Sequence, residues 1–165
     1  MIYCDDSGWG SLLGGVMIGL YNTDNNKFKC RLIPISYFQG KKFANGLYRQ
    51  YAKSIFLNMY GSIGESPNFC ICKGTILDAI YELVKSDKCI HVKRAEIKDP
   101  LQSWLENKFA QSLARIGVPR NSSGAHCLSF DDQLEWIKEN PKRIKYVKTG
   151  WTKWKTKYSA LMNSQ

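Results

Sequence analysis

The sequence of 165 residues contains no uninterrupted apolar run of the ~18 residues that a membrane-spanning helix requires. Its first residues carry neither the basic start nor the long apolar stretch of a secretory signal. We detect no internal repeat and no low-complexity segment. These absences argue against a membrane protein, an exported protein and a repeat array. The sequence therefore predicts a cytoplasmic protein whose length suits one main globular domain.

A cysteine pattern typical of a zinc site is also lacking. Five of the six cysteines lie inside or beside apolar runs such as Phe69-Cys70-Ile71-Cys72. Free cysteine behaves in proteins as a small apolar residue that is often buried. We therefore expect core cysteines instead of disulfides or a structural zinc site, and the six are Cys4, Cys30, Cys70, Cys72, Cys89 and Cys127.

Acidic residues are few compared with basic ones. The chain has 14 Asp and Glu residues against 24 Lys and Arg residues, which gives a formal net charge of +10. Such an excess favours a polyanionic partner, because contacts with phosphates dominate non-specific binding to nucleic acid. A basic surface that serves only solubility is the alternative.

Hydrophobic spacing predicts the order of the elements. The chain opens with three apolar strands, and later segments alternate between helical spacing and short apolar runs. This βββαβαβα order predicts an α/β fold with a mixed five-stranded sheet and helices on both faces. The expected strands are residues 1–5, 12–22, 28–35, 69–72 and 89–92, and the expected helices are residues 41–60, 75–84, 99–117 and 130–138.

The acidic pair Asp5-Asp6 stands where the first strand runs into the turn Ser7-Gly8. Carboxylates at a strand end suit Mg²⁺ or Mn²⁺, which prefer oxygen ligands and tolerate retained waters. On residue type alone, a turn stabilised by an Asp side chain is the favoured explanation of the pair.

A longer motif favours the metal interpretation. The run Asp-Asp-Ser-Gly-Trp-Gly-Ser-Leu-Leu-Gly-Gly-Val resembles the first motif of type 2 ribonucleases H, Asp-Glu-Ala-Gly-Arg-Gly-Pro-Leu-Ala-Gly-Pro-Val. The pair Lys41-Lys42 before Phe43 is similar to the Ser-Lys-Lys-Leu segment of that family. The positions that match the first motif in register are Asp5, Gly8, Gly10, Leu12, Gly14 and Val16.

The resemblance implies a ribonuclease-H-like fold, whose superfamily includes Holliday-junction resolvases and integrases. It implies that Asp5, with Asp6 beside it, joins acids from a later strand and a late helix around two metals ~4 Å apart that hydrolyse phosphodiesters. Glu96 and Asp132 are the preferred catalytic partners, and Asp78 and Glu106 are weaker candidates because each fits a solvated helix face. The expected metal ligands are Asp5, Asp6, Glu96, Asp99, Asp131 and Asp132.

Two departures from the family bear on the substrate. Trp9 stands where the family has an arginine that helps read the 2′-hydroxyl at an RNA–DNA junction, and Asp6 replaces a glutamate. Both an RNA–DNA hybrid and branched DNA therefore stay open as substrates. The resemblance implies contacts between nucleic acid and Gly8, Trp9, Gly10, Lys41 and Lys42.

The last part of the chain is basic and aromatic. Cations there can neutralise phosphates while exposed rings stack on unpaired bases. A final helix that buries its aromatic residues is the alternative. The candidate nucleic-acid contacts in this part are Lys142, Arg143, Lys145, Lys148, Trp151, Lys153, Trp154 and Lys155.

The sequence thus predicts a ribonuclease-H-like domain over residues 1–137 and a basic, aromatic tail over residues 138–165, packed on the domain or extending from it. The expected activity is a nuclease that depends on Mg²⁺ or Mn²⁺ and acts on RNA–DNA hybrid or branched DNA. The alternative is a catalytically silent domain of the same fold that binds nucleic acid or another protein.

Overall fold

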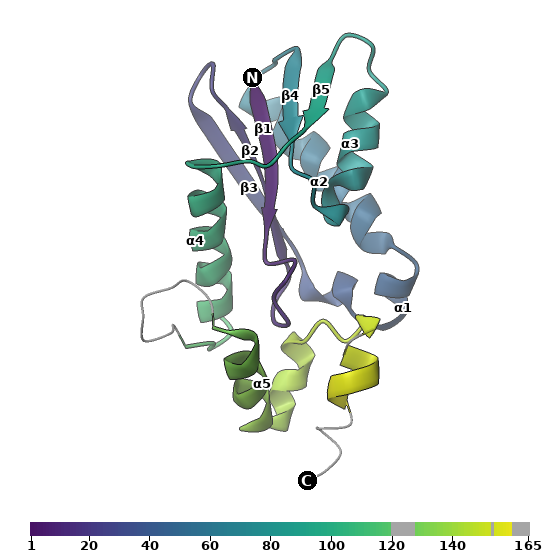
Figure 1. Cartoon of the computed structure of the whole chain (residues 1–165), viewed down its shortest axis with the longest axis vertical. Coiled ribbons are helices and arrows are strands. Elements are labelled where there is room, and N and C mark those ends of the chain that lie inside the picture. Colours follow the sequence, from purple (N-terminus) through teal and green to yellow (C-terminus); the bar gives the residue numbers. More distant parts are fainter. Residues whose placement is uncertain (120–127, 153, 160–165) are drawn as a thin grey trace.

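A five-stranded sheet lies between two layers of helices in the computed structural model, which describes residues 1–119, 128–152 and 154–159 (Figure 1). The sheet order is β3-β2-β1-β4-β5, which puts β1 in the middle. The strands are β1 (Ile2–Ser7), β2 (Val16–Asn22), β3 (Lys27–Ile33), β4 (Asn68–Ile71) and β5 (His91–Arg94).

The sheet is mixed. Strands β1, β2 and β3 form an antiparallel meander, whereas β4 runs parallel to β1 and β5 runs parallel to β4. The chain passes through helices between β3 and β4 and again between β4 and β5, which provides the long connections that parallel pairing requires. The predicted α/β class, the mixed five-stranded sheet and the order βββ then α, β, α, β, α are confirmed.

Helices cover both faces. Helices α2 (Leu47–Ile63) and α3 (Asp78–Lys85) lie on one face, and α4 (Leu101–Ala114) lies on the other (Figure 1). The described shorter helices are α1 (Gly40–Ala44), α5 (Phe130–Lys138), the 3-10 helices η1 (Ile35–Phe38), η2 (Thr75–Leu77) and η3 (Pro141–Tyr146), and the π-helical turn η4 (Trp154–Tyr158).

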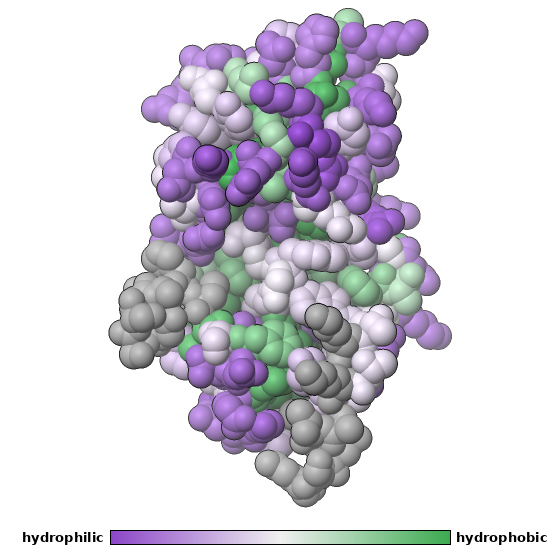
Figure 2. All heavy atoms as spheres, in the orientation of Figure 1, coloured by the Kyte–Doolittle hydropathy of each residue, from purple (hydrophilic) through white to green (hydrophobic). Residues whose placement is uncertain are grey.

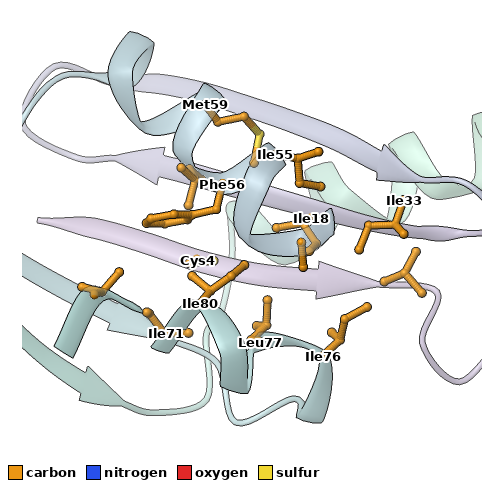
Figure 3. Packing of buried hydrophobic residues seen from close by; sticks show 14 of the residues in the cluster. Cys4, Ile18, Ile33, Ile55, Phe56, Met59, Ile71, Ile76, Leu77 and Ile80 are labelled. Atoms are coloured by element: carbon orange, nitrogen blue, oxygen red, sulfur yellow. The ribbon is translucent and has the colours of Figure 1, made fainter. Parts of the chain in front are cut away.

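One core fills the space between the sheet and helices α2 and α3. Cys4 and Ile18 project from β1 and β2, and Phe56 from α2 and Ile80 from α3 pack against them (Figure 3). These four side chains are 2% exposed or less, so this layer is closed to water and supplies stability through apolar burial.

A second core lies on the opposite face, beneath α4. Leu105 and Phe109 of α4 meet Leu12, and buried Trp136 and Trp154 extend the cluster toward the C-terminal part. The close approach of α4 depends on Gly19 of β2, because a Cβ there would lie 2.5 Å from Leu105 Cδ2. The C-terminal elements lie beneath the end of β1 (Figure 1).

Several predicted boundaries are wrong. The expected helix of residues 41–60 is divided between α1 and α2, because Gly46 has a φ of 66°, which places it in the left-handed region. The expected strand of residues 12–22 begins only at Val16, since Leu12 and Leu13 form a loop. The last strand starts two residues later than expected, after a turn in which Cys89 N–H donates to Asp87.

The cysteines of the described part are free. Cys4 and Cys70 are buried as expected, whereas Cys89 is exposed, contrary to the expectation from its sequence surroundings; Cys127 lies outside the described residues.

None of the helices among the described residues is both long and apolar enough to cross a membrane. On the face of the molecule drawn in Figure 2, mainly hydrophilic residues cover the upper half, whereas apolar residues reach the surface in the lower half, near α5.

Candidate functional site

Asp5 and Asp6 end the central strand but face opposite sides of the sheet. Asp5 is paired with Gly19, and this pair faces α4; Asp6 is paired with Ile18, whose side chain belongs to the core beneath α2 and α3. This follows from the alternation of side chains along a strand. The two carboxylates therefore do not form one chelating pair on a single face.

Asp5 is buried, with 6% of its surface exposed. Its carboxylate accepts a hydrogen bond of 2.8 Å from the backbone N–H of Asp6 and another from the thiol of Cys72, which follows β4. Burial raises the pKa of Asp5, the two hydrogen bonds lower it, and the charge of Glu106 on α4 raises it further. A cation placed here would relieve the electrostatic cost of the buried charge.

Asp6 also carries a perturbed carboxyl group. Burial raises its pKa to about 7, the charge of Asp5 contributes in the same direction, and the ammonium group of Lys148 opposes the shift. Gly74 after β4 allows this arrangement, because a Cβ there would lie 2.5 Å from Asp6 Oδ1. The protonated form of Asp6 is thus favoured far more than that of an ordinary aspartate.

The later acids that the sequence suggested do not gather around Asp5. Glu96 is exposed in the connection that follows β5, and it lines a cavity of 430 Å³ together with Tyr3, Tyr21 and Asp99. Asp99 accepts hydrogen bonds from the backbone N–H and the hydroxyl group of Ser103, so it caps the first turn of α4.

The acids of α5 also serve a helix end. Ser129 caps α5 by accepting from Asp132 N–H, and its hydroxyl donates to the Asp132 carboxylate at 2.7 Å. Asp131 is exposed in the same first turn. Asp78, a weaker candidate, forms an ion pair with Arg94 at 3.0 Å.

Within residues 1–119, 128–152 and 154–159, no three His, Cys, Asp or Glu side chains come close enough together to hold a metal ion. The expected six-ligand set is thus not a preformed cage. Glu106, expected to be a surface charge, is the late-helix acid whose charge acts on Asp5. Mg²⁺ is commonly held by one or two carboxylates together with water and substrate phosphates, so an ion can bind without such a cage.

The loop after β1 is held from the C-terminal part of the chain. Gln133 of α5 is buried, and its Oε1 accepts from the hydroxyl of Ser11 at 3.0 Å and from the N–H groups of Leu12 and Leu13. Lys148 donates from Nζ to carbonyl oxygens of the same loop. Sequence reasoning missed Gln133 altogether.

Lys148 was expected to contact phosphates from the surface. The structure corrects this expectation, because the side chain of Lys148 is 0% exposed. Trp154, expected as a base-stacking ring, is 4% exposed and belongs to the core. Trp151 and Trp9 are half-buried and pack against each other with ring centroids 6.3 Å apart. The buried alternative is therefore observed for Trp154, whereas Trp151 is only half-buried.

The other predicted contacts in the first motif differ in exposure. Gly10 is exposed, whereas Gly8 has a φ of 93° and lies so close to the Phe109 ring that a Cβ would clash. Backbone conformation and packing against Phe109 therefore explain the glycine at position 8 without a contact to nucleic acid.

Several predicted basic contacts remain on the surface. Gln39 Nε2 donates to the carbonyl oxygens of Lys145 and Val147, which brings the start of α1 beside the C-terminal segment. Arg143 stacks over Trp136 and pairs with Glu139 at 2.8 Å, so its charge is partly engaged within the protein. Lys153 lies outside the described residues. The predicted lysine contacts that are exposed are Lys41, Lys42, Lys142, Lys145 and Lys155.

Comparison with protein-family models, with curated proteins and with solved structures gave no match.

Proposed function

We propose that this chain is a ribonuclease-H-like nuclease that uses Mg²⁺ or Mn²⁺, with Asp5 as the central metal ligand. The sheet order β3-β2-β1-β4-β5 supports it, because that order sets the end of β1 beside the end of parallel β4. The resemblance in the first motif implies that the essential acid lies at these adjacent strand ends.

The observation that carries the proposal is the burial of Asp5. Its carboxylate accepts one hydrogen bond from a backbone N–H and one from a thiol, and both favour the charged form. Burial and the charge of Glu106 oppose ionisation. Acids held in so costly an environment are characteristic of functional sites. A divalent ion bound there would polarise a phosphoryl oxygen or activate a bound water.

The nucleic acid is the proposed partner because of the net charge of +10 and the exposed lysines near α1 and η3. Phosphate oxygens of the substrate would complete the coordination that Asp5 and Glu106 begin, as is usual for Mg²⁺ sites. RNA–DNA hybrid and branched DNA are the two substrate classes proposed.

A second candidate is a silent domain of the same fold that binds nucleic acid without cutting it. It is favoured by one observation, namely that the described residues form no group of three metal ligands. Fold and function separate readily in this way.

The deciding experiment is a cleavage assay with Mg²⁺ and with Mn²⁺ over hybrid, single-stranded, duplex and four-way-junction substrates. The nuclease proposal expects cleavage that Asp5→Asn abolishes and that Asp87→Asn, a change at an exposed aspartate, leaves intact. Binding without cleavage by the wild-type protein would support the silent domain instead.

A further inference from the structure

Lys148 has surroundings unlike those of the other lysines described above. Its ammonium group donates to the carbonyl oxygen of Gly8 at 2.6 Å and to that of Ser11 at 2.5 Å. The rings of Phe38, Phe109 and Trp151 lie 5.2 to 6.0 Å from Nζ. A fully buried ammonium is costly unless hydrogen bonds and ring faces compensate for lost water, and here both are present.

The backbone around Lys148 is joined to the same loop. Gly14 N–H donates to Tyr146 O at 2.9 Å, and Lys148 N–H donates to Leu12 O at 2.9 Å. Leu13 and Val147 form an antiparallel β-bridge. The segment of residues 146–151 is therefore bonded to the loop that immediately follows Asp5 and Asp6.

We propose that Lys148 is a positioning residue of the candidate site, where it holds the loop of residues 8–11 so that the end of β1 keeps the geometry that its chemistry needs. The inference rests on the proposed nuclease function. It makes the C-terminal segment part of the site and removes Lys148 from the set of phosphate contacts.

The geometry explains why a lysine is used. Gly8 and Ser11 present two carbonyl oxygens across one turn, and their shared donor must enter from an apolar, aromatic side. A long flexible stem with a terminal group that carries three donors meets this requirement. Methionine has a similar length but no donor, so Lys148→Met removes the two hydrogen bonds while it largely keeps the packing.

The first measurement is hydrogen exchange on the whole chain. In Lys148→Met we expect the amides of residues 8–14 to exchange at least about tenfold faster, while those of β2 and β3 keep their rates. The control is Lys88→Met, which changes an exposed lysine in the loop before β5 and is expected to alter neither. Unchanged exchange in residues 8–14 would overturn the proposal.

The second measurement separates positioning from phosphate contact and from a purely structural role. With a cleaved substrate, Lys148→Met should lower kcat by about 10²-fold and leave the Kd for nucleic acid, and its dependence on salt, unchanged. A weaker Kd with a salt slope flatter by about 0.9 would make Lys148 a phosphate contact and overturn the proposal, and so would an unchanged kcat.

If Lys148→Met fails to fold, Lys148→Leu, which likewise has no donor, is measured in the same way and judged by the same criteria. If the wild-type protein does not cleave at all, the nuclease function fails, and with it the role of Lys148 in the site; the exchange experiment then still shows whether Lys148 holds the loop.

Discussion

Among the candidate site residues, Asp5 is the one whose substitution should reduce cleavage most. Asp5→Asn keeps the side-chain volume and removes the charge that would bind the ion, so we expect cleavage to fall by about two to three orders of magnitude. Melting temperature should not fall, because burial already opposes the charged form. A folded Asp5→Asn protein with wild-type turnover would refute the assignment.

The later acids should differ in their effect on cleavage. The structure changes the expected order, since Glu106 influences Asp5 whereas Asp132 takes part in a helix cap. We now expect Glu106→Gln to reduce cleavage more than Glu96→Gln or Asp132→Asn does, by about tenfold or more. Cleavage rates measured at equal, saturating metal would decide between the three sites.

Asp6 predicts an unusual dependence of stability on pH. Its folded-state pKa of about 7 is above the value of about 3.9 in an unfolded chain. Between these values the unfolded state loses a proton that the folded state keeps, so this group makes the protein less stable as pH rises from 4 to 7.

The variant Asp6→Asn is neutral throughout and should lack this loss. The difference in the free energy of unfolding between Asp6→Asn and wild type should increase by up to about 4 kcal/mol from pH 4 to pH 8. Urea unfolding of both proteins at pH 4 and at pH 8 measures this difference. Asp87→Asn provides the control for a change in net charge alone. An equal gain in both variants, or none in Asp6→Asn, would show that Asp6 ionises normally.

A substitution at Gly19 tests the close contact between α4 and β2. Gly19→Ala would place a Cβ 2.5 Å from Leu105, and we expect the free energy of unfolding to fall by about 1–3 kcal/mol through overpacking. Gly61 in α2 is the matched control, because a Cβ there meets nothing within 4 Å. Gly61→Ala should stabilise the protein by about 0.5–1 kcal/mol; a similar effect of both changes in denaturant unfolding would contradict the close packing of α4.

For the molecule as a whole, the basic surface predicts how binding responds to salt. Lys142, Lys145 and Lys155 are exposed, and changing all three to Gln should weaken binding to every duplex sequence. The slope of log K against log salt should flatten by about 0.9 for each lost phosphate contact, with little change in melting temperature. An unaltered slope would place the nucleic acid elsewhere on the protein.

Sequence reasoning predicted the sheet and singled out Asp5 as a candidate because both signals are local. Apolar runs separated by turns predicted the strands, and Asp5 lies in a contiguous, glycine-rich motif. Gln133 and Lys148 give no such signal, since each contacts a loop that lies 122 or 140 residues away in the chain. The sequence predicts only that Glu106 is an exposed charge on a helix. Its effect on Asp5 depends on the register of β1, which makes Asp5 face α4.

The anchoring of residues 8–14 by Gln133 and Lys148 has a consequence for the order of folding. During synthesis the sheet and helices α2 to α4 can assemble as soon as their residues have left the ribosome. The loop after β1 must wait for the last fifth of the chain, and closing so long a connection carries an entropic cost. A nascent or proteolytically shortened chain that ends before Lys148 would keep the core beneath α2 and α3, but it would lack Trp154 of the second core and both hydrogen bonds from Lys148 to the loop. We therefore expect the loop of residues 8–11 to become ordered only when the last part of the chain has been made.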